Sequence, residues 1–206
     1  LRFSSRSGAD RRASVTIDLA TASDGELASL ALAGRQTAYS EIMRRHRDPI
    51  LRLIRAHTGT NDESVDVLQD CFVAAFASLD QLDLTRPMRP WLALIAINKS
   101  RDWRRRRVVR RFFSMALPLS PDIADTVADD APGVDAVLTG RAALNATLAA
   151  VASLPANLKE PLILSALDGW PQAAIGELLG ISEKAVETRI SRARQRLRHI
   201  LAASNR

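Results

Sequence analysis

The sequence is poor in the residues that build disulfides, metal centres and covalent active sites. Its 206 residues include one cysteine, Cys71, so no disulfide can form within the chain, and its apolar neighbours predict a buried, small side chain. The three histidines, His46, His57 and His199, show no metal-ligand spacing. No apolar run approaches the roughly 18 residues that would cross a membrane. We therefore expect no metal or other cofactor, no catalytic residue and no membrane insertion, in a cytoplasmic protein.

Aromatic residues and glycine are also scarce, which limits the fold classes. Aromatics make up 4% of the sequence and glycines number 9, whereas alanine, leucine, isoleucine and valine supply most of the 47% hydrophobic content. This composition favours helices over sheets. The net charge of +6 comes mostly from arginine, the side chain best suited to phosphate recognition. The expected fold is all-α.

Charge and apolar periodicity divide the chain into four parts. Residues 1–23 are basic and lack an apolar face, and we expect a disordered leader rather than the transit peptide that they resemble in composition. Residues 24–107 and 141–203 carry helical apolar spacing and predict two helical domains. Residues 108–140 gain aspartates and prolines and, beyond their first few positions, contain no lysine or arginine. A flexible acidic linker is therefore expected between the domains.

Apolar spacing predicts successive helices in the first block. Asp24 is the predicted N-cap of the first helix. The second covers residues 38–58 and ends at Gly59, with Pro49 either kinking it or marking a break. The third begins near residues 61–64, and its apolar stripe is predicted to comprise Val65, Leu68, Phe72, Ala75, Phe76 and Leu79.

Asp66, Gln69 and Asp70 lie opposite this stripe and share one face, since they occupy positions i, i+3 and i+4. This acidic patch is open to three interpretations: a solvated outer face, a docking patch for a basic partner, or a carboxylate pair for acid–base chemistry. The sequence offers no pocket, metal or phosphate-binding motif to accompany the last of these.

The stretch 91–107, WLALIAINKSRDWRRRR, changes from apolar to basic along one predicted helix. We expect that its four consecutive arginines cannot be paired with acidic residues nearby in the sequence. A helix that is rooted in a core and ends in a cationic surface suits a polyanion, although a core helix with a solvated tail fits equally well. One face of the helix is predicted to carry Trp91, Ile95, Asn98, Asp102 and Arg105 or Arg106.

The last part of the chain has the pattern of a helix-turn-helix. A short helix over residues 172–179, a turn at Gly180 and a long helix opened by Ser182 as N-cap are predicted. The long helix would face Val186 and Ile190 inward and present its outward side to the major groove of DNA. A plain helical hairpin is the alternative, but the clustering of arginines favours DNA binding.

Pro161 restricts the helix that precedes this motif. A proline in the second turn of a helix would cost up to about 3 kcal/mol, because it removes an amide donor and clashes with the preceding turn. We therefore predict that the helix starts near residues 157–159, which places Pro161 in its first turn.

Taken in order, these motifs resemble those of the group IV (extracytoplasmic-function, ECF) sigma factors of bacterial RNA polymerase. The segment SVDVLQDCFVAAF is similar to the polymerase-clamp helix of sigma domain two. RPWLALIAINKSRDWRRRR is similar to the promoter-melting and minus-ten segment of the same domain. LPANLKEPLIL, DGW, AIGELLGIS and VETRISRARQRLR resemble sigma domain four.

The resemblance implies a non-enzymatic, alternative sigma factor that directs promoter-specific transcription initiation in a stress response. Its implied partners are core RNA polymerase (the beta-prime clamp helices and the beta flap), promoter DNA and an anti-sigma factor. Asp66, Gln69 and Asp70 would contact the clamp helices. The implied minus-ten surface comprises Trp91, Asn98, Lys99, Arg101, Arg105 and Arg106. The implied minus-thirty-five surface comprises Ser182, Lys184, Glu187, Thr188, Arg189, Ser191 and Arg192.

Three features depart from the family's pattern. Glu187 is acidic where the family usually has lysine or arginine, Pro161 replaces an aliphatic residue, and WPQAAIG replaces the usual L-S-Y-x-E-I-A. None of the three removes a feature that the fold requires. Two other functions stay open: a two-domain helix-turn-helix regulator that does not bind core polymerase, and a helical enzyme that uses Asp66 and Asp70.

Overall fold

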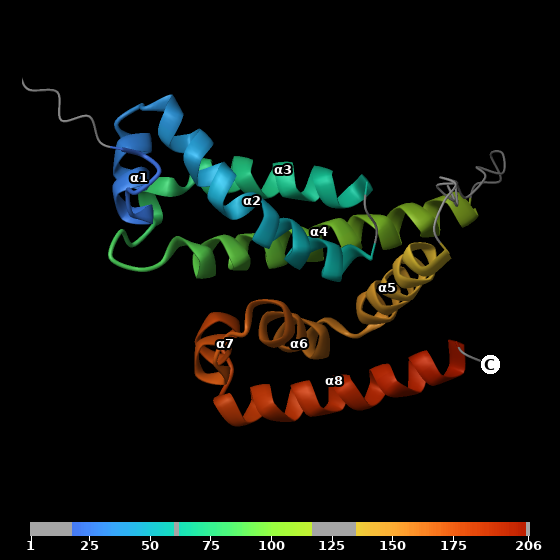
Figure 1. The fold of residues 1–206 in the computed structure, drawn as a ribbon. Coiled ribbons are helices and arrows are strands. Elements are labelled where there is room, and N and C mark those ends of the chain that lie inside the picture. Colours follow the sequence, from blue (N-terminus) through green and yellow to red (C-terminus); the bar gives the residue numbers. More distant parts are fainter. Residues whose placement is uncertain (1–17, 60–61, 117–134, 205–206) are drawn as a thin grey trace, which may run out of the picture.

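The computed structural model describes residues 18–59, 62–116 and 135–204, and most of these residues are helical. Across these ranges it has eight α-helices, one 3₁₀ turn and no strand, which confirms the all-α prediction. Figure 1 shows two blocks, with α1–α4 above and α5–α8 below. The elements are α1 (Asp24–Leu32), α2 (Gln36–Thr58), α3 (Asp62–Ala77), η1 (Leu79–Gln81), α4 (Met88–Ala116), α5 (Asp135–Ser153), α6 (Ala156–Asp168), α7 (Gln172–Leu179) and α8 (Glu183–Ser204).

The first helix is capped by Ser23, and the prediction of Asp24 was wrong by one residue. The Glu26 amide donates to Ser23 Oγ at 3.2 Å, and the Ser23 amide donates to Glu26 Oε2 at 2.7 Å. This reciprocal pair satisfies two amides at the helix start, which one aspartate cannot do. Asp24 lies in the first turn instead, with its carboxylate 3.2 Å from His46 Nε2, and this contact lowers the pKa of Asp24.

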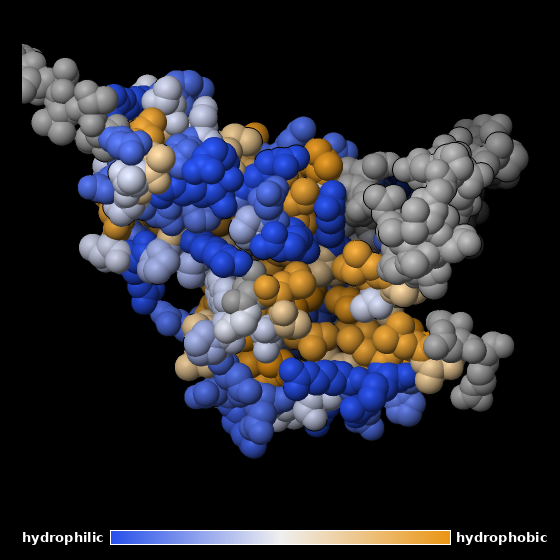
Figure 2. Space-filling model, in the orientation of Figure 1, coloured by the Kyte–Doolittle hydropathy of each residue, from blue (hydrophilic) through white to orange (hydrophobic). Residues whose placement is uncertain are grey.

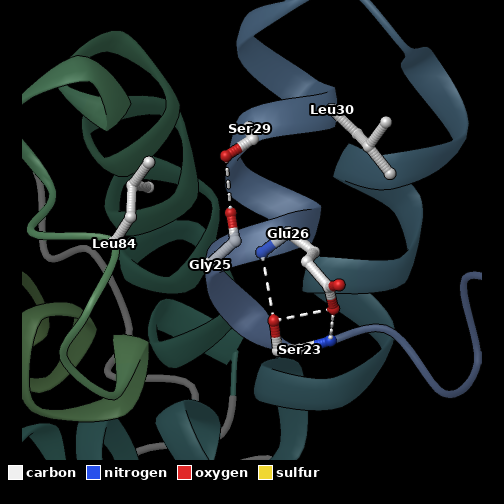
Figure 3. Close-up of a pocket in the computed structure, with 6 residues that line it drawn as sticks. All are labelled: Ser23, Gly25, Glu26, Ser29, Leu30 and Leu84. Carbon is white, nitrogen blue, oxygen red and sulfur yellow. Dashed lines mark hydrogen bonds between the residues drawn. The ribbon is translucent and has the colours of Figure 1, made fainter.

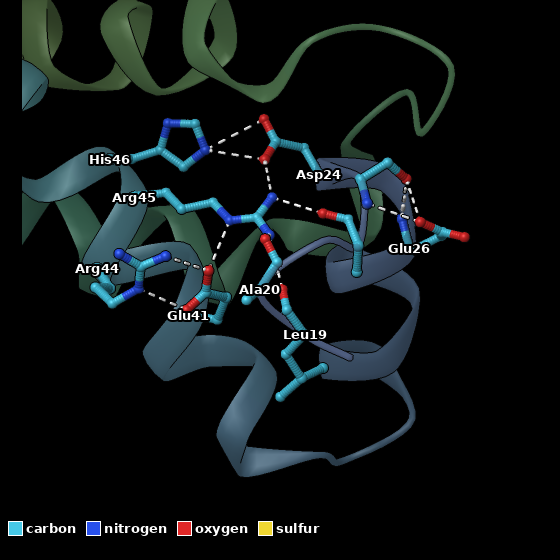
Figure 4. Close-up of polar contacts among 10 residues, drawn as sticks. Leu19, Ala20, Asp24, Glu26, Glu41, Arg44, Arg45 and His46 are labelled. Atoms are coloured by element: carbon cyan, nitrogen blue, oxygen red, sulfur yellow. Dashed lines mark hydrogen bonds and ion pairs between the residues drawn. The ribbon is translucent and has the colours of Figure 1, made fainter. Parts of the chain in front are cut away.

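Arg45 of α2 holds the segment before α1 against the first block (Figure 4). Its guanidinium donates to Glu41 Oε1 at 2.8 Å and to backbone carbonyls of residues 19–22 at 2.6, 2.7 and 3.0 Å. Residues 18–23 of the expected leader are therefore fixed to α2. Residues 1–17 of that leader lie outside the described ranges.

Helix α2 runs unbroken from Gln36 to Thr58 and contains Pro49. It ends at Gly59, as predicted, because Gly59 has φ 73°, a left-handed conformation that favours glycine. Tyr39 of α2 meets Phe76 of α3 edge to face, with ring centroids 4.8 Å apart. Such contacts fix α2 against α3.

Helix α3 buries Leu68, Phe72 and Ala75, and η1 buries Leu79, as predicted, but Val65 is exposed. The buried face passes through Val67 and Cys71, so Val65 lies one position off it. The assignment of Val65 to the apolar stripe was therefore wrong. Cys71 is fully buried, and this burial raises the pKa of its thiol to about 12, so its predicted role as a small core side chain is confirmed.

Helix α4 continues to Ala116, and α5 begins at Asp135. Regular helix therefore reaches into both ends of the segment 108–140 that the sequence assigned to a linker. Residues 117–134 of that segment lie outside the described ranges.

Helices α7 and α8 form the predicted helix-turn-helix. Gly180 between them has φ 66°, and the Ala185 amide donates to Ser182 Oγ at 3.2 Å, which confirms Ser182 as the N-cap. Gly176 allows the close approach of the turn, because a Cβ there would lie 2.6 Å from the Ile181 carbonyl oxygen. Val186 and Ile190 are buried, as their spacing predicts.

The position of α6 contradicts the prediction for Pro161. The helix begins at Ala156, so Pro161 is its sixth residue and lies in the second turn. The Leu158 and Lys159 amides both donate to the Pro155 carbonyl, at 3.0 and 2.9 Å, which anchors the earlier start. Burial of residues 162–164, at 7% exposure or less, offsets the missing hydrogen bond.

The two blocks are packed against each other. Buried residues of α6, α7 and α8 join those of α1–α4 in one continuous core. Figure 2 shows apolar residues gathered in the band between the blocks, with hydrophilic rims above and below. The second block therefore packs on α2 through α5 and α6, and Arg101 and Arg104 from the middle of α4 form hydrogen bonds to it.

Candidate nucleic-acid interface

The acidic patch lies on the outer side of α3. Asp66, Gln69 and Asp70 are all exposed, and α3 packs on α2 and α4 at the side of the first block away from α6–α8 (Figure 1). The structure thus brings the three predicted residues together on an open surface. They are available to a partner that approaches from outside the molecule.

Val73 adds an apolar side chain to this patch. It is 70% exposed and lies one turn beyond Gln69 and Asp70. We did not identify it from the sequence, although the signal was present: a valine among helical residues that falls outside the buried stripe. An exposed aliphatic side chain can add apolar contact area to an interface whose rim is polar.

The predicted minus-ten residues lie along α4, half-buried or exposed in its first half and exposed from Arg101 onward. Trp91 is half-buried at the start of the helix, Asn98 is exposed, and Lys99 is half-buried. Asn98 Oδ1 accepts a bond from Arg101 at 3.3 Å. These side chains therefore follow the predicted change from core to surface.

Arg101 is directed toward the second block. Its Nε and Nη2 atoms bind the two carboxylate oxygens of Glu160 at 2.7 and 2.5 Å. Glu160 comes from α6, so this predicted DNA contact has a carboxylate partner from the other block.

The arginine run is partly neutralised by neighbouring acids. Arg105 forms an ion pair with Asp102, one turn back, and Arg107 pairs with Glu63 of α3 at 2.9 Å. The prediction that these arginines have no local partner was therefore wrong, because Asp102 lies three residues before Arg105. Arg105 and Arg106 remain exposed to solvent and can still reach a phosphate backbone.

The predicted minus-thirty-five residues are the N-cap of α8, Ser182, and residues in its first three turns. Lys184 Nζ forms an ion pair with Glu187 Oε2 at 2.8 Å, and this contact raises the pKa of Lys184. Thr188 donates its hydroxyl to the Lys184 carbonyl at 2.9 Å, while Ser182 caps the helix. Ser191 and Arg192 are exposed, and Arg189 is half-buried.

A shallow hollow beside α1 includes Glu26, whose carboxylate caps the helix, and Gly25, where a Cβ would collide with the Leu84 carbonyl (Figure 3). This hollow is a packing feature of α1 against the loop before α4. Among the residues that the structure describes, no three His, Cys, Asp or Glu side chains cluster to hold a metal ion, and no helix is long and apolar enough to span a membrane.

Comparison with known proteins matches both blocks. The family model described as Sigma-70 region 2 matches residues 42–110, and the one described as Sigma-70, region 4 matches residues 144–197. The RNA polymerase sigma factor CnrH of Cupriavidus metallidurans is 37% identical over 183 residues, which covers 88% of this chain and 96% of CnrH. NccH of Alcaligenes xylosoxydans xylosoxydans, also an RNA polymerase sigma factor, is 34% identical over 182 residues, or 88% of this chain and 96% of NccH.

Solved structures of sigma factors match this chain in fold. The structure of CnrH in complex with the cytosolic domain of CnrY is 31% identical and matches with a TM-score of 0.60, covering 87% of this chain and 97% of that one. The sigma factor RpoE of Bartonella quintana, in complex with the anti-sigma factor NepR, matches in fold with the same TM-score of 0.60 at 21% identity.

Proposed function

We propose that separate surfaces of this chain, which belongs to the ECF (group IV) RNA polymerase sigma factors, bind core polymerase and the two promoter elements. The observation that carries the proposal is the presence of two separate exposed surfaces in one chain: the acidic patch with Val73 on α3, and the outward face of α8. The first block binds core polymerase and the minus-ten strand. The second binds the minus-thirty-five duplex. The chain supplies no catalytic group, and RNA synthesis belongs to the polymerase.

Core polymerase binds at the acidic patch of α3. Asp66 and Asp70 supply negative charge that attracts a basic surface such as the beta-prime clamp helices, and Val73, one turn beyond Asp70, supplies an apolar contact. The beta flap is the second proposed contact, on the second block. The proposed location is the cytoplasm, because core polymerase and promoter DNA are found there.

The minus-ten strand binds along α4. Trp91 offers an aromatic face on which an unstacked base can stack, and Asn98 offers both a donor and an acceptor to base edges. Lys99, Arg101, Arg105 and Arg106 hold the backbone phosphates.

The minus-thirty-five duplex binds α8 through its major groove. On the outward side of the helix, Glu187 is surrounded by the other proposed contacts: Ser182, Lys184, Thr188, Arg189, Ser191 and Arg192. A carboxylate at Glu187 can accept a bond from the amino group of cytosine, whereas it repels phosphate. Its observed partner, Lys184, is exposed, so their pairing contributes little to stability and can give way to a base.

Glu187→Arg is expected to increase general DNA binding and its salt dependence, while weakening the native minus-thirty-five site relative to other sequences. Arginine favours guanine O6 and N7 over cytosine. A promoter-library selection with both proteins measures this, and Glu183→Arg is the matched control, since it makes the same charge change at a position outside the proposed reading set. Identical preferred bases at every upstream position would mean that Glu187 reads nothing.

An anti-sigma protein is the third proposed partner. The support is the structure of CnrH, 31% identical to this chain, in complex with the cytosolic domain of CnrY. A protein of that kind would hold this factor inactive until a signal releases it.

Titration of fluorescently labelled chain with purified core polymerase tests the proposal. Saturable binding at nanomolar to low micromolar concentration is expected. A regulator that acts without polymerase would instead bind a specific duplex by itself and show no affinity for the core enzyme.

A further inference from the structure

The contact between the two blocks contains two buried charged residues, adjacent in α6. Lys159 is 1% exposed and Glu160 is 3% exposed. Isolated charges of this kind are costly to bury, so each must have partners that compensate for lost hydration. Both find them at the contact between the blocks.

Lys159 joins the ends of two helices. Its Nζ donates to the His57 carbonyl at 3.2 Å and to the Ala152 carbonyl at 2.6 Å. His57 is at the end of α2 in the first block, and Ala152 is at the end of α5 in the second. Carbonyls in the last turn of a helix lack helical partners and carry partial negative charge. One ammonium therefore satisfies both helix ends and holds them together.

Glu160 makes the second connection. Both of its carboxylate oxygens bind the guanidinium of Arg101, at 2.7 and 2.5 Å, in the bidentate geometry that is the strongest form of this pair. Arg104 adds a bond of 3.4 Å to the Leu154 carbonyl. Two arginines of α4 are thus bound to the second block.

The backbones at this contact are close together. A Cβ at Gly59 would lie 2.8 Å from the Ala152 Cβ, so glycine is required for the approach. At the other end of α4, Trp91 and Leu94 line a groove whose opposite wall is formed by Trp170 and Leu178. The second block therefore faces the proposed minus-ten surface along much of its length.

This arrangement conflicts with promoter binding. An Arg101 held by Glu160 is not available for phosphate, and Trp91 lies opposite a tryptophan of the second block. The two promoter elements stand about 25 base pairs apart by their names, or about 85 Å along a straight duplex. Helix α8 has 22 residues and is about 33 Å long, and it is held in the second block by α5, α6 and α7, of which α5 and α6 pack on α2 of the first block. A docked chain cannot reach both elements at once.

We propose that the Arg101–Glu160 pair and Lys159 form an autoinhibitory latch, which holds the free factor closed and covers part of its own minus-ten surface. The latch must open before both promoter elements are engaged. This inference rests on the proposed function for its consequence in transcription, but the closed contact itself can be tested without polymerase.

Glu160→Gln tests the latch in the full chain by DNA binding alone. The probe is a fluorescent single strand of about 12 nucleotides of mixed sequence, titrated over a series of salt concentrations. Release of Arg101 is expected to raise affinity about threefold or more at low salt, and to steepen the logarithmic salt slope by about 0.7. Glu177→Gln is the matched control. It removes the same charge and also breaks a pair between the blocks, Arg86–Glu177, but that pair is exposed at 67% and 68% and contributes little.

Equal affinities for Glu160→Gln and Glu177→Gln would overturn the latch. Weaker binding by Glu160→Gln would also overturn it, and would mean that Glu160 is needed only for folding. A thermal melt of each variant identifies that case.

A covalent lock tests the consequence for transcription. Arg86→Cys with Glu177→Cys, bridged by a short bismaleimide, fixes the blocks in the docked position, while Cys71 stays unreacted because it is fully buried. The bridged protein is expected to support at least about tenfold less run-off transcript than the same variant capped with N-ethylmaleimide. Equal activity of the two forms would overturn autoinhibition. Inactivity of the capped form and of the unmodified chain would instead refute the proposed function, and the DNA titration would then decide the latch by itself.

Discussion

Replacement of Asp66 and Asp70 by arginine is expected to lower the affinity for core polymerase at least about tenfold, or about 1.4 kcal/mol, while the fold is retained. Both side chains are exposed on α3, so the change removes no buried contact. Like charges facing a basic partner are costly and slow association. The measurement is a binding titration of labelled protein with core polymerase at two salt concentrations, since the loss should be larger at low salt.

The control is Asp48→Arg with Asp80→Arg, which changes the net charge equally at two exposed acids of the same block outside the patch. This control should bind core polymerase almost as the unmodified chain does. Equal losses in the two double variants would assign the effect to net charge. An unchanged affinity after replacement of Asp66 and Asp70 would remove the patch from the interface.

Acid is expected to destabilise the fold through His57. This side chain is 7% exposed, and burial, followed by the nearby charges of Lys159, Arg101 and Arg104, lowers its pKa from 6.5 to about 3. Between these values the unfolded chain binds a proton that the folded chain rejects. Stability contributed by neutral His57 is therefore present above about pH 6.5 and is lost as the pH falls toward 3, by up to about 5 kcal/mol.

His57→Leu isolates this contribution. The leucine removes a buried Nε2 that has no hydrogen-bond partner within the described parts of the chain, and it keeps the backbone carbonyl that Lys159 binds. Urea unfolding at pH 7.5 and 4.5 is the measurement, and the native protein should lose about 3 kcal/mol more than the variant across this range. Asp24 and Glu41, whose pKa values are also lowered, contribute equally to both proteins and cancel. Parallel losses in the two proteins would contradict the role of His57.

Local patterns in the sequence predicted most of the helical elements. The spacing of Leu68, Phe72 and Ala75 marks a buried face, and Gly59, Gly180 and Ser182 end or begin helices through properties of the single residue. Such signals act over one or two helical turns, so they can be detected from sequence alone. The capping of α1 was missed by one residue, although Ser23 and Glu26 carry the pattern of a capping box.

The packing of the blocks could not be predicted in this way. Lys159 and Glu160, in the polar-looking segment ANLKEP, have the composition of a solvated surface, and their burial depends on Arg101 and on helix ends far away in the sequence. Pro161 was misplaced for the same reason, because long-range burial outweighed a local cost. In the site, the Lys184–Glu187 pair was within reach of sequence reasoning, whereas the Arg101–Glu160 pair was not.

Run-off transcription with purified core polymerase, in the presence and absence of this chain, tests the central claim most directly. The template is a pool of linear DNA randomised over the promoter region, and the transcripts are sequenced. We expect transcripts with discrete start sites and a shared upstream sequence only when the chain is present, and their loss with the arginine replacements at Asp66 and Asp70. The same transcripts with and without the chain, together with sequence-specific binding of the chain alone to duplex DNA, would contradict its assignment as an initiation factor.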